Sequence, residues 1–582
     1  MEIKPHAVQA LLTALLRDVE AGLHSEAHDN NHVDTWMITP PSVRRVAIDH
    51  YMHHYRVLID VVIHHVEHRG PGVLLIDLPT YGKHFDKGLS SNFDWKVFDQ
   101  SGLSFKPKQL KALFSDIFDD SGRPHDSVTP NMVFYIRQVL YLFKKYSIDC
   151  PDTKVKEAVN DFIKIDQGLR EPSGSWYSDH WVPGSRSFVG SPELSGTHSR
   201  AEKLWGTVDA VFRSIVPMHE VDRLRVRPKH GPGAVADMKT GGDKYSFPYW
   251  PSKLEANFPF VAFGQHREDL HIDSEVPQPS RKEPPARLIA VPKTFSGPRL
   301  IASEPIAHQF LQQGLMEWIR DHMSPLLRNT ITFTNQEYNQ QAALTGSKYG
   351  DLATVDLSSA SDRLSCWTVE RALASNQSLL ECLHAVRTRN IIDATGTDPN
   401  LSLRLKKFAA QGSAVTFPVQ TIIYAGLSIA AVLFVDNRRS TRRNIREAAG
   451  QVRVFGDDIV LPSKCVPLLT LMLNSLELKV NALKTHASGS FRESCGMDAY
   501  KGYEVTPLYI KTLAWNKSPE KAQSFIDVCN NAHKAGLWNI SALMESWIPK
   551  NIRKKTITIR SEGDGIRLFT FCRGFSTQAQ IR

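Results

Sequence analysis

The sequence has no closely spaced cysteines and no obvious leader. Its seven cysteines are scattered over 582 residues, and none forms a C-x-x-C pair. Zinc ribbons and disulfide scaffolds need such pairs, so neither is indicated, and a reducing cytosol is the expected environment. The N-terminal segment lacks the continuous apolar stretch of a secretory signal peptide. No internal repeat is visible at the periods that solenoid proteins use.

Long hydrophobic runs are also scarce. One such run, Thr421 to Val435, carries no charge and has 15 residues, whereas a helix that crosses a bilayer core needs about 20. An arginine-rich stretch follows it, as after a stop-transfer helix. Because the run is too short, we predict a buried core helix and no membrane partner.

Positive charge is in excess. The formal net charge is +9, and residues 512–582 contain eleven Lys and Arg against five Asp and Glu. Such an excess suits a polyanionic partner, and phosphates are expected to contact five basic residues of this segment: Lys550, Arg553, Lys554, Lys555 and Arg560. A non-catalytic basic RNA-binding or assembly protein would show the same tail, with salt-sensitive binding.

The length predicts several lobes, because a single core rarely grows beyond about 250–300 residues. The first third has the three- and four-residue apolar spacing of amphipathic helices. After Pro285 short β-branched runs alternate with helical patterns. The sequence therefore predicts an α+β fold with a largely helical N-terminal region.

Two apolar runs flank Gly-Asp-Asp in VRVFGDDIVL, from Val452 to Leu461. This pattern predicts a β-hairpin with Asp457 and Asp458 at the tight turn, which glycine makes accessible. Gly and Asp are favoured in any surface turn, so the tripeptide is only suggestive by itself.

A second acidic motif, LATVDLSSASDRLS, places Asp356 after an apolar run. If that run is a strand beside the hairpin, Asp356, Asp457 and Asp458 meet at one sheet edge. Carboxylate oxygens facing phosphate favour Mg²⁺, with Mn²⁺ as a substitute. Two such ions activate an attacking 3′-hydroxyl and stabilise departing pyrophosphate, so the motif pair predicts an RNA polymerase site.

Asp362, further along this motif, is expected at the start of a helix and is assigned to recognition of the ribose 2′-hydroxyl. A DNA-making enzyme would prefer a bulky aromatic residue about five positions after the first aspartate, where this chain has Ser361. Ribonucleotides are therefore the expected substrates. Ser and Asp are also common helix caps.

Other polar residues are candidates for binding substrate. The basic segment from Arg281 to Arg299 predicts a strand-loop-strand unit whose Lys293 and Arg299 hold triphosphate oxygens, although a solvated basic face explains it as well. Lys484 is a candidate proton donor to pyrophosphate. Contacts to template backbone and ribose are expected from three polar residues of QGSAVTFPVQT: Ser413, Thr416 and Gln420.

With these pieces in order, the chain resembles the catalytic β subunit of the replicases of leviviruses, the small positive-strand RNA bacteriophages. The resemblance rests on ATVDLSSASD, FGDDIVLPS and FRESCG, together with VTPLYIK and the VPK…R…SEP run, and is clear from Arg287 to Lys511. The chain departs from the family's usual loop at Gly412-Ser413-Ala414 and at Pro418, which leaves the roles of Ser413 and Gln420 open.

The resemblance implies a right-hand polymerase fold and RNA-directed RNA synthesis without a primer, usually starting with GTP, in the cytoplasm of a bacterial host. It implies RNA, nucleoside triphosphates, the host elongation factors Tu and Ts and a ribosomal small-subunit protein as partners. It places metal ligands at Asp356, Asp457 and Asp458. We expect an N-terminal region and fingers over 1–280, a fingers nucleotide-channel segment over 281–345, a palm over 346–511, and a basic thumb over 512–582.

An enzyme of another class is also conceivable. His64, Glu67 and His68 fit H-x-x-E-H, the helical pattern of some zinc hydrolases. The chain has 23 histidines and shows no third ligand, so a histidine cluster on an amphipathic helix is the better interpretation.

Overall fold

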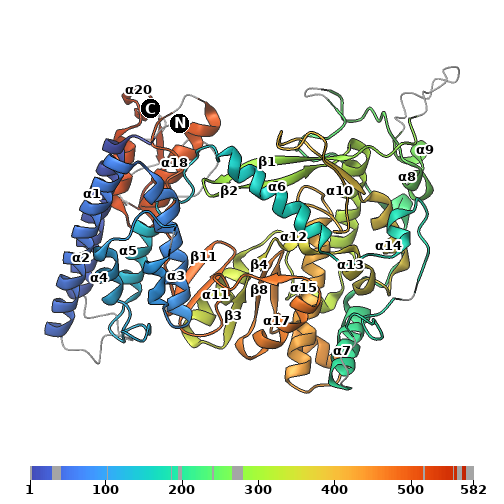
Figure 1. The fold of residues 1–582 in the computed structure, drawn as a ribbon, viewed down its shortest axis with the longest axis horizontal. Helices are drawn as coiled ribbons and strands as arrows, with labels where there is room; N and C mark the ends of the chain where they lie inside the picture. The colour runs from blue at the N-terminus through green and yellow to red at the C-terminus, as the bar shows by residue number, and fades with distance from the viewer. Residues whose placement is uncertain are drawn as a thin grey trace.

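The computed structural model describes residues 3–28, 41–100, 102–184, 186–194, 199–238, 242–264, 279–515, 518–554, 556–559 and 567–571. Helices dominate the first third of the chain, and short strands alternate with helices after residue 285, as Figure 1 shows. The predicted α+β class and the helical N-terminal region are confirmed.

A three-stranded antiparallel sheet lies near the middle of the molecule. Its order is β3 (Leu352–Val355), β8 (Asp458–Pro462) and β7 (Arg453–Phe455). The central strand β8 is buried from Ile459 to Pro462, because helices α11 (Glu337–Tyr349) and α15 (Thr416–Val435) pack against the sheet. The predicted antiparallel sheet with the Gly-Asp-Asp hairpin is confirmed.

Helix α15 contains the long apolar run. It is long and apolar enough to cross a membrane, but 89% of its most apolar 18-residue window is buried inside the protein. Ile423, Leu427 and Ala431, spaced by four, are fully covered, and its neighbours include α7 (Ser199–Ile215) and α17 (Val466–Ser475). The expected core helix is confirmed.

A second sheet holds the basic segment. Strands β1 (Ala286–Thr294) and β2 (Gly297–Ser303) form the predicted strand-loop-strand hairpin. Strands β5 (Asn390–Asp393) and β6 (Ser402–Arg404) complete the sheet in the order β2-β1-β5-β6, and helix α6 (Asp152–Gln167) packs along the hairpin.

The two ends of the described chain share one hydrophobic core. Buried residues between Ile3 and Tyr146 pack with buried residues between Phe491 and Leu568, and in Figure 1 the blue and orange-red segments lie side by side. This body contains the following elements: α1 (Pro5–His28), α2 (Pro41–Arg69), α3 (Leu78–Ser90), α4 (Lys108–Ser115), α5 (Pro130–Tyr141), β10 (Phe491–Ser494), β11 (Met497–Tyr500), β12 (Tyr503–Glu504), α18 (Pro519–Lys534), α19 (Trp538–Ser546), α20 (Lys550–Arg553), β13 (Ile557–Ile559) and β14 (Arg567–Phe569).

A buried ion-pair network within this body ties the N-terminal helices to strand β11. Arg137 of α5 donates hydrogen bonds to the carboxylates of Asp86 on α3 and Asp498 on β11, and to the carbonyl of Val505 at 3.0 Å. Only 2% of its side chain is exposed. The N-terminal helices are therefore anchored on β10–β12, whereas the expected boundaries at residues 280, 345 and 511 stay a prediction.

The remaining described α-helices and strands are α8 (Ser252–Asn257), α9 (Phe260–Phe263), α10 (Ile306–Asp321), α12 (Ala360–Arg363), α13 (Cys366–Ala372), α14 (Gln377–Val386), α16 (Arg442–Ala449), and the paired strands β4 (Leu357–Ser358) and β9 (Lys479–Val480).

Candidate active site

The Gly-Asp-Asp hairpin is tighter than expected. Phe455 pairs with Asp458, so Gly456 and Asp457 alone form the turn and Asp458 begins strand β8. Gly456 has a φ of +63°, and an added Cβ there would lie 2.8 Å from the Phe417 ring. Its N–H donates to the Thr421 hydroxyl at 3.1 Å. Helix α15 therefore fixes the turn.

Strand pairing brings Asp356 to the same place. Strand β3 runs antiparallel to β8 with Val355 opposite Ile459, and the next step of that register sets Asp356 opposite Asp458. Directly opposed residues of antiparallel strands have Cα atoms about 4.5–5.5 Å apart. The Asn481 amide also donates to the Asp356 carboxylate at 2.9 Å. The predicted convergence of strand end and turn is confirmed.

The three aspartates face one polar cavity of about 500 Å³. The segment that follows strand β3, the hairpin, the β1–β2 unit and strand β10 all contribute to the wall. The residues that line it are Lys293, Pro298, Arg299, Leu300, Asp356, Leu357, Ser358, Ser359, Ala360, Ser361, Asp362, Gln411, Asp457, Asp458, Asn481, Lys484, Glu493, Cys495 and Gly496.

Negative charge in this cavity is poorly compensated. Burial, reinforced by the charges of Asp457 and Glu493, raises the pKa of Asp356 to about 6. Burial and the neighbouring Asp457 raise the pKa of Asp458 to about 7. Asp356 and Asp458 therefore hold their protons more tightly than ordinary surface carboxyls do. An additional cation in the cavity would stabilise their charged forms.

Lys484 supplies part of the missing positive charge. Its Nζ lies 3.9 Å from Oδ1 of Asp356 and 3.6 Å from Oε1 of Glu493. Burial alone would lower the pKa of Lys484, but Glu493 and Asp356 outweigh burial and hold that pKa well above its ordinary value. Lys484 is therefore protonated at the acidic cluster, as a proton donor must be.

The other predicted basic residues stand across the cavity. Val291 of β1 pairs with Arg299 of β2, and both Lys293 and Arg299 line the cavity wall. Burial and the positive charges of Arg299 and Lys484 lower the pKa of Lys293. A polyanion bound between these cations and the aspartates would relieve the electrostatic repulsion among Lys293, Arg299 and Lys484.

Comparison with known proteins finds relatives for this site. Residues 274–539, here called the replicase-family segment, match the model of the family described as RNA replicase, beta-chain. The β subunit of the RNA-directed RNA polymerase of Escherichia virus Qbeta is 31% identical over 311 residues, 51% of this chain and 48% of that protein. The β chain from Escherichia phage MS2 is 33% identical over 225 residues, 38% of this chain and 37% of that protein. The chain therefore spans half or less of the length of these relatives.

Solved structures with a similar arrangement include an RNA-dependent RNA polymerase of BmCPV at the elongation state. It has a TM-score of 0.47 and 10% identity, covering 84% of this chain and 46% of that one. The polymerase of a human picobirnavirus, an insertion loop deletion mutant, has a TM-score of 0.35 and 12% identity, covering 67% of this chain and 79% of that one. TM-scores below 0.5 do not establish a shared fold.

Within the replicase-family segment, Asp362 is held by a residue that the sequence did not single out. Asp362 lies on α12 and lines the cavity, and the ammonium of Lys407 donates to its Oδ1 at 3.2 Å. Lys407 is fully buried and stacks on the Phe162 ring at 3.3 Å. A buried cation with this anchor fixes the carboxylate toward the cavity.

The residues expected to contact template and ribose, Ser413, Thr416 and Gln420, lie inside the protein. All three side chains are buried, and none lines the cavity; Gln411 does so instead. The Thr416 hydroxyl donates to the Ala410 carbonyl at 2.9 Å, which joins the first residue of α15 to the loop before it. Their roles toward template and ribose stay a prediction.

Four residues of the replicase-family segment escaped the sequence argument because their roles arise from long-range pairing. Glu493 sits within the FRESCG motif, so an acid in a polar motif was the available signal. Asn481 follows the short strand β9, and Thr421 looks like one more residue of an apolar helix. These four residues are Glu493, Asn481, Lys407 and Thr421.

Part of the basic tail can be located. Lys550, Arg553 and Lys554 are exposed at and just after the short helix α20. Lys555 and Arg560 lie outside the described residues. Their phosphate contacts stay a prediction.

The hydrolase alternative finds no support in the geometry. His64 and His68 stack with ring centroids 4.1 Å apart, but Nδ1 of His68 is hydrogen-bonded to the His64 carbonyl at 2.8 Å. Among the described residues, only one group of three His, Cys, Asp or Glu side chains has its ligand atoms within 4.8 Å of one another. This group is His50, His54 and Asp116. The H-x-x-E-H pattern therefore lacks a third ligand there.

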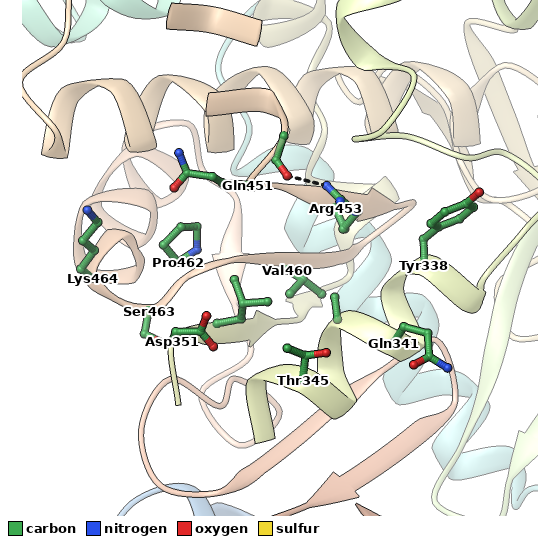
Figure 2. A pocket seen from close by; sticks show the side chains of 13 residues that line it. Tyr338, Gln341, Thr345, Asp351, Gln451, Arg453, Val460, Pro462, Ser463 and Lys464 are labelled. Atoms are coloured by element: carbon green, nitrogen blue, oxygen red, sulfur yellow. Dashed lines mark hydrogen bonds between the residues drawn. The ribbon is translucent and has the colours of Figure 1, made fainter. Parts of the chain in front are cut away.

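A larger cavity, of about 760 Å³, lies between α11 and strands β7 and β8. Figure 2 shows Tyr338, Gln341 and Thr345 on the α11 side and Arg453 and Val460 on the strands. Its lining has one acid, Asp351, and no cluster of titratable groups. The smaller cavity, which is lined by five acids and three cations, is therefore the better candidate for the chemistry.

Proposed function

We propose that this chain is an RNA-directed RNA polymerase that copies an RNA template from ribonucleoside triphosphates. The observation that carries the proposal is the register that sets Asp356 of the strand end against Asp458 of the Gly-Asp-Asp hairpin, in one cavity with Lys293, Arg299 and Lys484. The match of residues 274–539 to the RNA replicase beta-chain family supports the same activity. In this proposal β3, β7 and β8 form the palm of a right-hand polymerase.

The acidic residues fit a divalent cation. Their donors are all carboxylate oxygens, and the pKa values of Asp356 and Asp458 are raised first by burial and then by the negative charge of neighbouring acids. Asp356, Asp457 and Asp458 would hold two Mg²⁺, or Mn²⁺ in its place. When bound, these cations activate the attacking 3′-hydroxyl and stabilise the developing charge on pyrophosphate.

The protein's own groups complete the reaction. Lys293 and Arg299 bind triphosphate oxygens and orient the nucleotide. Lys484, whose proton is held by Asp356 and Glu493, donates it to pyrophosphate as the bond to the α-phosphorus breaks. Asp362 accepts a hydrogen bond from the ribose 2′-hydroxyl, and small Ser361 leaves room for that group.

The prediction for ribose recognition concerns Asp362→Ala. Loss of a hydrogen bond to a charged acceptor costs about 1.5–3 kcal/mol, so the ratio of kcat/KM for ribonucleotides over deoxyribonucleotides is expected to fall roughly 10- to 100-fold. Steady-state incorporation of each nucleotide type measures this ratio. Asp161→Asn, at an exposed acid on α6, is the matched control. An unchanged ratio in Asp362→Ala would remove this role.

Two further cavities extend the site toward the C-terminal helices. One, of about 440 Å³, shares Lys293 with the active site. The other, of about 700 Å³, shares Gly496 with the active site, and both contain Lys145 and Lys511. Lys521 and Lys534 add positive charge, and the five lysines outnumber the three acids: Asp149, Glu504 and Asp527. This continuous basic surface suits an RNA backbone leaving or approaching the aspartates.

Neutralising Lys145, Lys511 and Lys521 together with glutamine is expected to weaken binding of single-stranded RNA. Each lost phosphate contact lowers the slope of log affinity against log salt by about 0.7, so the slope should fall by roughly 2. Fluorescence anisotropy over a salt series measures it. The charge-matched control replaces three exposed lysines of the N-terminal helical body: Lys96, Lys108 and Lys111. Equal slopes for both triple variants would contradict an RNA path along this surface.

The finer points belong to the same proposal. The resemblance to leviviral replicases supports initiation without a primer, usually starting with GTP. It also supports assembly with host elongation factors Tu and Ts and a ribosomal small-subunit protein in the bacterial cytoplasm. The exposed tail cations Lys550, Arg553 and Lys554 are assigned to the grip on template and product.

The proposed function is tested by an incorporation assay on RNA and on DNA templates, with ribo- and deoxyribonucleotides, with and without the host factors. We expect ribonucleotide incorporation that depends on Mg²⁺ and that occurs on RNA templates but not on DNA templates. Incorporation that survives a chelator, or that prefers deoxyribonucleotides, would refute the proposal. Activity only with the host factors would support both the proposal and the assembly.

A further inference from the structure

Helix α2 carries a pair of histidines that lie outside the active site and beside a carboxylate. His50 and His54 are four residues apart and therefore lie on one face of the helix. Helix α4 packs beside α2, and Asp116 follows its last residue, Ser115. The three residues lie among the N-terminal helices α1 to α5, whose hydrophobic core is separate from the core around the central sheet.

The ligand atoms of this group already converge. Nδ1 of His50 lies 2.8 Å from Oδ1 of Asp116, and Nδ1 of His54 lies 2.8 Å from its Oδ2. The two imidazole rings meet edge to face with centroids 4.3 Å apart. All three ligand atoms lie within 4.8 Å of one another. Among the residues that the structure describes, no Lys or Arg pairs with Asp116, so its carboxylate is committed to the two rings.

Burial of the three side chains is graded from inside to outside. Asp116 and His54 expose 9% and 21% of their side chains, and His50 exposes 63%. The Asp116 carboxylate is thus largely shielded from solvent, while the His50 side of the group is exposed to it. A cation can enter from that side, and a water or another ligand can complete its coordination.

We propose that His50, His54 and Asp116 bind one borderline divalent cation, with Zn²⁺ as the first candidate. Two imidazole nitrogens and one carboxylate oxygen are a common three-ligand set for zinc, and they favour zinc over Mg²⁺, which prefers oxygen alone. Both rings bind through Nδ1, so each carries its proton on Nε2. The ion joins α2 to the end of α4 and stabilises the helical body.

The same helix offers a matched control. His64 and His68 have the same four-residue spacing, but Nδ1 of His68 is occupied by the His64 carbonyl. Among the described residues no carboxylate pairs with either ring. The spacing of two histidines alone is therefore not sufficient for this site, and the Asp116 carboxylate is the distinguishing element.

The test uses the full-length chain without an affinity tag, equilibrated with Zn²⁺ in excess Mg²⁺ and analysed for bound zinc after gel filtration. We expect one zinc per chain in the wild type, in Asp457→Asn, and in the double variant His64→Ala/His68→Ala. His54→Ala and Asp116→Asn are expected to bind zinc at least tenfold more weakly. Zinc should raise the melting temperature of the wild type and leave those two variants unchanged.

Asp116→Asn preserves shape and hydrogen bonding, and its melting temperature without zinc shows whether the variant folds. Co²⁺ in place of Zn²⁺ gives a visible absorption spectrum that reports nitrogen and oxygen ligands directly. Wild-type protein without stoichiometric zinc would overturn the proposal and leave a hydrogen-bonded His–Asp–His cluster. Zinc lost in His64→Ala/His68→Ala, or retained in both His54→Ala and Asp116→Asn, would overturn it as well.

Discussion

Asp457→Asn is expected to abolish nucleotide incorporation, by roughly 10³-fold or more, which corresponds to about 4 kcal/mol of lost transition-state stabilisation. The amide has the size of the carboxylate but lacks the negative charge that a catalytic cation requires. Asp457 stands in the two-residue turn and lines the cavity with Asp356 and Asp458. Single-turnover extension of a primed RNA template measures the loss.

The fold and the RNA affinity of this variant should survive. Asp457 is one of the charges that raise the pKa of Asp356 and Asp458, so removing it relieves repulsion, and the metal-free melting temperature should stay equal or rise. Asp120→Asn, at an exposed acid of the N-terminal body, is the control and should retain full activity. Incorporation near the wild-type rate by Asp457→Asn would exclude the proposed chemistry.

Arg137→Met is expected to be the most damaging single change to stability, by about 3–5 kcal/mol, because it leaves two buried carboxylates without their cation. Arg137 joins Asp86 and Asp498 between α5, α3 and β11. The matched control is Arg56→Met, whose pair with Glu20 has side chains 53% and 33% exposed; exposed pairs contribute about 0–1 kcal/mol. Denaturant unfolding, followed by hydrogen exchange of α3 and α5, measures both.

The loss in Arg137→Met should depend on pH. Burial raises the pKa of Asp86 and Asp498 in the folded protein, and the positive charge of Arg137 opposes that rise. Without Arg137 both pKa values rise further above their unfolded values. A raised carboxyl pKa costs folding stability as pH increases past the unfolded value, so the deficit should be larger at pH 8 than at pH 6. If Arg137→Met lost no more unfolding free energy than Arg56→Met at either pH, this role of Arg137 would be contradicted.

The local parts of the site could be predicted from the sequence. Apolar runs on both sides of Gly-Asp-Asp determine a hairpin, and the glycine determines its turn, because these preferences act over neighbouring residues. The run before Asp356 predicts a strand for the same reason. Lys293 and Arg299 follow from a hairpin that the sequence also signals.

The long-range parts could not be predicted. Asp356 lies opposite Asp458 because Val355 pairs with Ile459. The two strands are about 100 residues apart, and nothing in either local sequence predicts which residues pair. Likewise Lys407 gives no sign in the sequence that its ammonium is buried against Asp362. The core shared by the N-terminal helices and the segment after Phe491 depends on packing between the two chain ends.

The central claim, that three distant aspartates share a pair of cations, is tested most directly by crystals of the chain grown with RNA, a non-hydrolysable ribonucleotide and Mn²⁺. Anomalous scattering locates Mn²⁺ independently of any assumption about its ligands. We predict two manganese peaks about 3.5–4 Å apart, contacted by Asp356, Asp457 and Asp458. Peaks elsewhere, with these three carboxylates free of metal while the nucleotide is bound, would contradict the claim.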